Sequence, residues 1–173
     1  YSPIMATLRI PRPCAIALVG MPGSGKTRVG TALAQALALP FIDSDAAVEQ
    51  ATGSTIAELF AAGGEPAFRA LDGTPKVLAT GGGAFAWPPS RDLLRAAATT
   101  VWLRVPVAVL AHRLGPAAAR PLLAGADLEQ ELARLLARRE AAYAQTDLAV
   151  DADAAPAEVV ARILAALDRR EAA

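Results

Sequence analysis

The stretch that decides the fold is Gly20-Met21-Pro22-Gly23-Ser24-Gly25-Lys26-Thr27. It fits the pattern G-x-x-x-x-G-K-[ST], in which glycines let backbone N–H groups turn towards phosphate oxygens. A helix that begins at the lysine directs its positive end at the same anion. We expect Lys26 to bridge the β- and γ-phosphates of a nucleotide and the Thr27 hydroxyl to ligate Mg²⁺. The sequence therefore predicts a phosphate site formed by Gly23, Ser24, Gly25, Lys26 and Thr27.

The segments around this loop alternate between apolar runs and helical patterns. Residues 14–19 form a continuous apolar run, typical of a buried parallel strand, and residues 26–39 repeat apolar side chains at helical spacing. Further strands are predicted at 41–43, 76–80, 99–105 and 148–150, and helices at 45–51, 54–62, 90–98, 107–114, 127–143 and 156–170. Ser90 is the expected cap of its helix. This alternation predicts an α/β fold, with a parallel sheet covered by helices on both faces.

Length and charge restrict the class of protein. The 173 residues suit one domain, taken as 5–173, with Met5 as the expected natural start and residues 1–4 as a remnant before it. Seventeen basic and seventeen acidic residues balance, which argues against a nucleic-acid clamp or a polybasic membrane binder. There is no apolar run long enough for a membrane span. A single cysteine excludes an internal disulfide and fits the reducing cytoplasm.

The phosphate loop does not identify the acceptor of the phosphoryl group. A GTPase would need an N-K-x-D sequence to bind guanine, and the chain contains no asparagine. A motor-type ATPase would need a longer chain. A small-molecule kinase remains the best interpretation.

Five further motifs resemble, together and in this order, those of shikimate kinases. They are Phe41-Ile42-Asp43-Ser44-Asp45, Gly64-Glu65-Pro66-Ala67-Phe68-Arg69, Gly81-Gly82-Gly83-Ala84, Arg120-Pro121-Leu122-Leu123 and Arg139-Glu140-Ala141-Ala142-Tyr143. The resemblance covers most of the chain. It implies phosphoryl transfer from ATP to the 3-hydroxyl of shikimate, on the route to chorismate and the aromatic amino acids. It also implies a three-layer α/β/α sandwich of the P-loop NTPase type, with strand order 2-3-1-4-5, a lid at about 113–126 and a substrate-binding region at about 45–72.

Two carboxylates stand two positions apart at the end of a predicted strand, so their side chains should point the same way. The resemblance implies that Asp43 supports Mg²⁺ through water and that Asp45 holds the shikimate hydroxyls. Because the transition state of phosphoryl transfer is loose, Asp45 either accepts the proton or only orients the hydroxyl. Both residues could also cap the next helix.

Two arginines match the family's clamp for the substrate carboxylate, which a guanidinium can bind with two parallel hydrogen bonds. They are Arg69 and Arg139, and the spacing to Tyr143 favours Arg139 over its neighbour Arg138. The resemblance places the backbone of Gly81, Gly82 and Gly83 against the substrate ring. It makes Phe60 and Phe68 apolar walls of the pocket, although packing in the core alone would also explain these two.

Two more arginines belong to the expected lid and its base. The resemblance implies that Arg120 reaches the transferring phosphate and neutralises developing charge. It places Arg113 near adenine, where the competing interpretation is an exposed helix end.

Two other function classes stay open. One is another small-metabolite kinase acting on gluconate or a nucleoside monophosphate, and the other is a nucleotide-binding regulator without catalysis. The expected partners are shikimate and ATP, without nucleic acid or membrane, and the expected state is a monomer. The chain departs from the family pattern between Arg69 and Gly81, where about nine residues, roughly two and a half helical turns, have no counterpart. We expect a missing segment near Leu71–Asp72; the alternative is a genuinely shortened family member.

Overall fold

A computed structural model describes residues 15–43, 74–81, 83–115 and 127–173. The strands are β1 (Ala15–Val19), β2 (Phe41–Asp43), β3 (Lys76–Ala79), β4 (Ala98–Arg104) and β5 (Leu148–Asp151). The helices are α1 (Lys26–Leu37), α4 (Pro88–Ala97), α5 (Val107–Leu114), α6 (Leu128–Tyr143) and α7 (Pro156–Ala172). Within the described ranges, strands and helices alternate along the chain as the sequence predicts.

The five strands form one parallel sheet in the order β2-β3-β1-β4-β5. This confirms the fold class and strand order expected from the sequence. Strand β1 is central, with Leu18 paired to Ala79 on one side and to Val101 on the other. Because all strands run the same way, their carboxyl ends meet at one edge of the sheet, where ligands bind in such folds.

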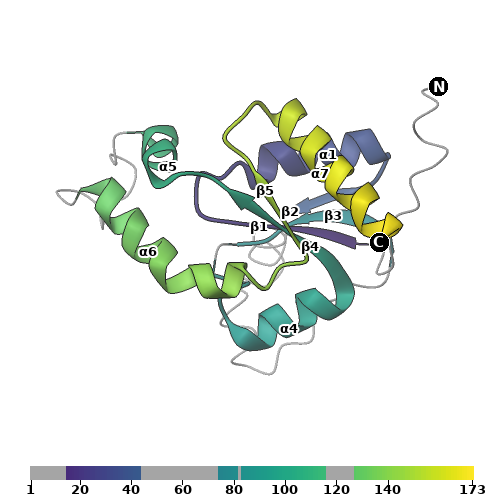
Figure 1. Ribbon diagram of the computed structural model, residues 1–173, viewed down its shortest axis with the longest axis horizontal. Coiled ribbons are helices and arrows are strands. Elements are labelled where there is room, and N and C mark those ends of the chain that lie inside the picture. Colours follow the sequence, from purple (N-terminus) through teal and green to yellow (C-terminus); the bar gives the residue numbers. More distant parts are fainter. Residues whose placement is uncertain (1–14, 44–73, 82, 116–126) are drawn as a thin grey trace.

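Helices cover both faces of the sheet and complete three layers (Figure 1). Helices α1 and α7 pack together on one face, and α4 and the end of α6 lie on the other. Helix α5 follows β4 and packs against α6. The described helices include none that is long and apolar enough to span a bilayer.

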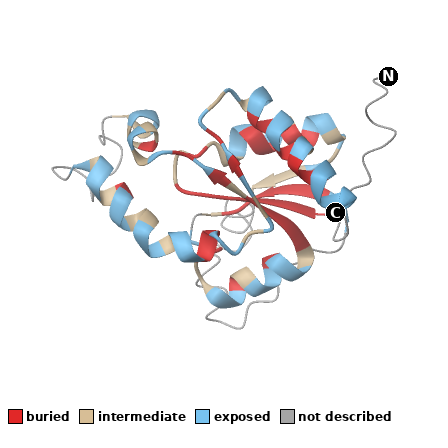
Figure 2. Ribbon diagram, in the orientation of Figure 1, coloured by how far each residue is buried: buried red, intermediate tan, exposed pale blue. Residues whose placement is uncertain are grey.

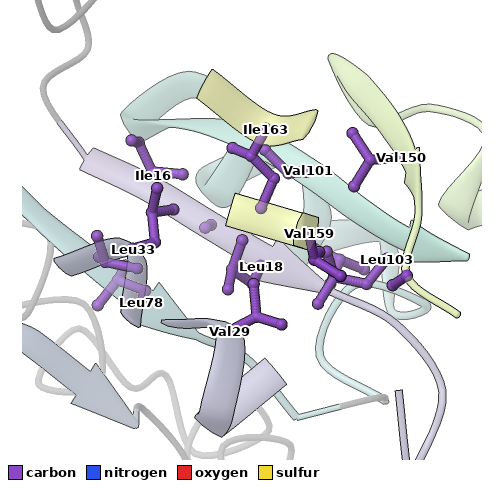
Figure 3. Packing of buried hydrophobic residues seen from close by; sticks show 14 of the residues in the cluster. Ile16, Leu18, Val29, Leu33, Leu78, Val101, Leu103, Val150, Val159 and Ile163 are labelled. Carbon is purple, nitrogen blue, oxygen red and sulfur yellow. The ribbon is translucent and has the colours of Figure 1, made fainter. Parts of the chain in front are cut away.

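The core lies mainly between the sheet and the pair α1–α7 (Figure 3). Val29 and Leu33 of α1, and Val159 and Ile163 of α7, are buried at 3% exposure or less and pack over the central strands, where Leu18 is fully buried. The inner strands are buried on both faces, as Figure 2 shows, while each helix presents one buried stripe. Burying a side chain of this size contributes about 1.5–3 kcal/mol. The core therefore fixes β1 and α1, the two elements that hold the phosphate loop.

The observed boundaries differ from the expected ones in two informative places. Helix α1 stops at Leu37 because Ala38 adopts a left-handed conformation (φ 53°) and its N–H closes the helix end. The prediction that Ser90 caps its helix is wrong. Helix α4 begins earlier, at Pro88, whose ring presets the helical φ, and its cap position is Trp87 without a side-chain cap bond.

Several expectations fall outside the described residues. These are the start of the first strand at Cys14, the helices at 45–51 and 54–62, the substrate-binding region at 45–72, most of the lid at 113–126, and the junction Leu71–Asp72.

Candidate active site

The phosphate loop joins the end of β1 to the start of α1, as its pattern predicts. Gly23 and Gly25 have φ values of 81° and 93°, in the left-handed region that side chains disfavour. The N–H of Ser24 donates to the Met21 carbonyl oxygen at 3.1 Å, and the N–H of Val29 donates to the Gly25 carbonyl oxygen at 2.8 Å. The loop is therefore a closed turn that leads directly into the first turn of the helix.

The Lys26 side chain folds back over this loop. Its Nζ donates to the carbonyl oxygens of Gly20 at 2.8 Å and Met21 at 3.0 Å. The ammonium group thus lies at the mouth of the loop, at the positive end of α1. Two positive features converge where a phosphate chain would enter.

The base of the loop is too tight for a side chain at Gly20. A Cβ there would lie 2.8 Å from Ser24 Oγ and 3.0 Å from the Leu103 carbonyl oxygen. Ser24 is 1% exposed, and its Oγ has no hydrogen-bond partner in the described part of the chain. Buried hydroxyls normally have a partner. The unsatisfied hydroxyl therefore fits a loop that receives a polar ligand.

Arg113 connects three segments beside the loop. Its guanidinium donates to the Gly23 carbonyl oxygen at 3.2 Å and to the Ala152 carbonyl oxygen at 3.0 Å. Arg113 thereby ties the end of α5 to the phosphate loop and to the connection between β5 and α7. A cavity of about 510 Å³ opens there. It is lined by Gly23, Ser24, Gly25, Arg28, Val29, Arg113, Ala152, Ala154, Ala155 and Pro156.

Two neighbouring strands end at the same edge as the phosphate loop. Asp43, the last residue of β2, pairs with Ala79 of β3. The next residue, Thr80, donates from both its N–H and its hydroxyl to the Leu18 carbonyl oxygen, at 3.1 and 3.0 Å. These two hydrogen bonds fix the start of the glycine run against the end of β1. Asp43 and Gly81 therefore both lie at the phosphate-loop edge of the sheet.

Helix α6 brings Arg139 to the glycine run from the other side. A Cβ at Gly83 would lie 3.7 Å from a guanidinium nitrogen of Arg139, so the two residues are near neighbours. Arg139 is half-buried, whereas Arg138 is exposed. Tyr143 lies one turn further along α6 and is fully buried. Burial raises the pKa of Tyr143, while the nearby Arg139 guanidinium acts in the opposite direction.

The structure thus brings Gly23, Ser24, Gly25, Lys26, Thr27, Asp43, Gly81, Gly83, Arg113 and Arg139 to one end of the sheet. The remaining predicted site residues lie outside the described residues: Asp45, Phe60, Phe68, Arg69, Gly82 and Arg120. Among the described residues, no three His, Cys, Asp or Glu side chains are grouped as a metal site would need.

Sequence reasoning overlooked two features of the site. It used Tyr143 only to fix the register of Arg139, although a spacing of four on a helix also places the two side chains on one face. It had no signal for the bond between Arg113 and Ala152, because that contact depends on how α5 and the β5–α7 connection approach each other.

The family model for shikimate kinase matches residues 22–168. The chain belongs to the shikimate kinase family. A shikimate kinase of Cereibacter sphaeroides is 44% identical over 165 residues, covering 90% of this chain and 83% of that protein. The solved shikimate kinase of Acinetobacter baumannii in complex with shikimate is 34% identical, with a TM-score of 0.74 over 93% of this chain and 96% of that chain. A solved gluconokinase of Sinorhizobium meliloti is less similar, at 28% identity and a TM-score of 0.61 over 91% of this chain and 93% of that one.

Proposed function

We propose that the chain transfers the γ-phosphoryl group of ATP to the 3-hydroxyl of shikimate, giving shikimate 3-phosphate and ADP. The observation that carries the proposal is the position of Arg139. It stands at the glycine run, on the same sheet edge as the phosphate loop. A guanidinium there suits a planar carboxylate, which shikimate carries and a nucleoside monophosphate lacks. The complex of the Acinetobacter baumannii family member with shikimate supports the same substrate.

The nucleotide would occupy the phosphate loop and the cavity beside it. Lys26 would exchange its bonds to the Gly20 and Met21 carbonyl oxygens for the β- and γ-phosphates. Arg113 and the small residues Ala152 and Ala154 would form the walls for adenosine. In this arrangement the chain contributes mainly position and positive charge, which is what a loose phosphoryl transition state requires.

Mg²⁺ fits the oxygen groups at this edge. Thr27 is the second residue of α1 and is exposed, and Asp43 is the last residue of β2 and is half-buried. Mg²⁺ prefers such hard oxygen ligands and keeps several waters. Thr27 would hold the ion directly and Asp43 would hold it through water. When bound, the ion would neutralise charge on the phosphates.

The acceptor side completes the site. Arg139 and Arg69 would bind the carboxylate of shikimate, and Gly81, Gly82 and Gly83 would approach its ring. The pocket walls would be Phe60 and Phe68. Asp45 would either accept the proton of the 3-hydroxyl or only orient this hydroxyl, and Arg120 would neutralise charge on the moving phosphoryl group. Because ATP is a cytoplasmic nucleotide, we place the reaction in the cytoplasm, with the chain acting as a monomer.

A coupled assay of ADP release with shikimate tests the proposal. Wild-type protein should turn over shikimate and ATP, and show no comparable rate with gluconate or a nucleoside monophosphate. Lys26→Ala should lower kcat by several orders of magnitude, because it removes a cation from the transition state. Near-normal kcat in this variant would remove the phosphate loop from the mechanism.

Adjacent arginines on α6 provide a matched pair for the acceptor side. Arg139→Ala should raise KM for shikimate roughly a hundredfold and leave ATP affinity unchanged, since a charged hydrogen-bonding pair is lost. Arg138→Ala, at the exposed neighbouring position, should behave as wild type. An equal effect of both variants would contradict the role of Arg139.

Asp45→Asn tests whether this carboxylate takes part in turnover at all, as a base or as the group that orients the hydroxyl. The variant should keep nucleotide affinity and lose most turnover. Retention of more than half the wild-type kcat would exclude Asp45 both as a base and as the group that orients the hydroxyl.

A further inference from the structure

We propose that Arg162 is a positioning residue for ATP: its guanidinium holds the end of β5, so that the connection from β5 to α7 forms a fixed wall of the nucleotide cavity. The inference rests on the proposed function, because that cavity is taken there as the site for adenosine. It assigns a role in donor binding to a residue of α7 that does not itself line the cavity.

This wall consists of small residues that need an anchor from outside. The connection between β5 and α7 covers residues 152–155, and three of these four residues are alanines. Alanine side chains make no hydrogen bonds, so the segment can be held mainly through its backbone. Ordering a loose segment at the moment a ligand binds costs conformational entropy and weakens the binding. The groups that hold this backbone therefore decide whether the wall is in place before the nucleotide arrives.

Arg162 supplies one of these anchors from the second turn of α7. Its Nη1 donates to the Asp151 carbonyl oxygen at 2.8 Å, and its Nη2 lies 3.9 Å from Oε2 of Glu158. Asp151 is the last residue of β5, so the hydrogen bond is made where the strand ends and the connection begins. The guanidinium thereby bonds α7 back to the strand that precedes it.

The next carbonyl oxygen along the chain is held by a different helix. Ala152 is 2% exposed, its N–H donates to the Arg104 carbonyl oxygen at 2.8 Å, and its own carbonyl oxygen accepts from Arg113 at 3.0 Å. Two guanidiniums, from α7 and α5, thus bind two successive carbonyl oxygens. Arg113 lines the cavity and Arg162 does not. An effect of Arg162 on the nucleotide must therefore pass through the position of this segment or through its charge alone, and experiment can separate the two routes.

Arg162→Met tests the proposal, because methionine keeps a long side chain and good helix propensity but removes the donors and the charge. The dissociation constant for ATP should rise about three- to fivefold, the loss expected for one exposed hydrogen bond from a charged group. The values of kcat and of KM for shikimate should stay within twofold of wild type. Unchanged ATP affinity would overturn the proposal, and so would an equal loss for both substrates, because that would indicate a structural defect.

Inorganic tripolyphosphate separates the position of the wall from the charge of Arg162. This probe carries the anionic part of ATP without adenosine, so the loss of a distant positive charge would weaken both ligands alike. In Arg162→Met the dissociation constant for tripolyphosphate should stay within twofold of wild type while that for ATP rises. An equal loss for the two ligands would mean that Arg162 acts through its charge and not through the wall. Titration calorimetry with Mg²⁺ and without shikimate measures both constants, so the comparison does not depend on turnover.

Two matched variants identify the bond that matters. Glu158→Gln removes the ion pair with Arg162 but leaves the hydrogen bond to Asp151, and its ATP affinity should stay within twofold of wild type. Arg162→Lys keeps a charged donor and should bind ATP more tightly than Arg162→Met. A loss in Glu158→Gln as large as that in Arg162→Met would place the effect in the ion pair. Equal ATP affinity of the lysine and methionine variants would likewise contradict the hydrogen bond.

The wild-type protein separates failure of this inference from failure of the proposed function. If wild type does not bind ATP, the proposed function falls and this inference falls with it. If wild type binds ATP and phosphorylates shikimate, and Arg162→Met is indistinguishable from it, only the positioning role is overturned. Thermal unfolding of each variant shows that the comparison is made on folded protein.

Discussion

Arg113 donates a hydrogen bond from its guanidinium to the carbonyl oxygen of Gly23, with 3.2 Å between the two heavy atoms. A helix end is thereby bonded to a loop that precedes it by ninety positions in the chain. The same guanidinium also holds the Ala152 carbonyl oxygen at 3.0 Å. A single side chain therefore binds two opposite segments that line the cavity beside the phosphate loop.

Arg113→Ala should weaken ATP binding and spare shikimate. Since Arg113 is largely exposed, each of its two bonds is screened by water, and we expect a rise in KM for ATP of about three- to tenfold. KM for shikimate should stay within twofold. Arg134→Ala, which removes an exposed ion pair with Glu131, is the matched control and should change neither constant. Equal loss for both substrates would argue for a general disturbance of the fold.

Gly30→Ala should have opposite effects on stability in two backgrounds. A Cβ at Gly30 would clash with Cε2 of Phe41, so the added methyl must displace the ring and should cost about 1–2 kcal/mol of unfolding free energy. In a Phe41→Ala background the clash is gone. The same change should then stabilise α1 by up to about 1 kcal/mol through helix propensity. Chemical denaturation of the four proteins measures both values, and the same sign in both backgrounds would contradict the contact.

Asp147→Ala should destabilise the fold by about 2–3 kcal/mol. One carboxylate oxygen accepts from both the N–H and the hydroxyl of fully buried Thr100, at 2.8 and 3.0 Å, so its removal leaves buried donors unsatisfied. Asp147→Asn keeps an oxygen for these bonds and should cost less than about 1 kcal/mol, which is the usual worth of the exposed ion pair with Arg170 that it removes. Equal losses in the two variants would place the stabilisation in the ion pair.

Stability at high pH should depend on Tyr143. Its folded-state pKa is raised by burial above the ordinary value of 10.0, so above that pH the unfolded chain releases this proton more readily than the folded one. The unfolding free energy should therefore fall as pH rises above 10, and this contribution should be absent in Tyr143→Phe. Because the chain has only two tyrosines, absorbance at alkaline pH can follow the titration directly. Identical alkaline profiles for the two proteins would refute the expectation.

The sequence predicts those parts of the fold that depend on local pattern. The apolar runs give β1, β3 and β4 within a residue or two, and the helical spacing gives α5 at its observed bounds. The prediction that Ser90 caps its helix failed because Pro88, two positions earlier, has the stronger local preference for the first helical turn. The order of the strands followed from the resemblance to the family, since apolar runs alone do not say which strands are neighbours.

The site was predictable where residue type and spacing carry the chemistry. The phosphate loop follows from its glycines and lysine, and Arg139 follows from its position one turn before Tyr143. The position of Arg113 could not be predicted in the same way. Its hydrogen bonds go to backbone carbonyl oxygens of two distant segments. Every residue has such an oxygen, so residue type does not indicate which one will accept a bond.

The central place of β1 has a consequence for how this chain folds. The strand that leads into the phosphate loop pairs with β3 and β4, which are both made much later along the chain, and it has no pairing with β2. Contacts between such distant segments form slowly, because a long loop must close before they bring any gain. A nascent chain that ends before Arg104 lacks one of the two strands that flank β1. The nucleotide site should therefore mature late during synthesis, although the phosphate loop is made before β3 and β4.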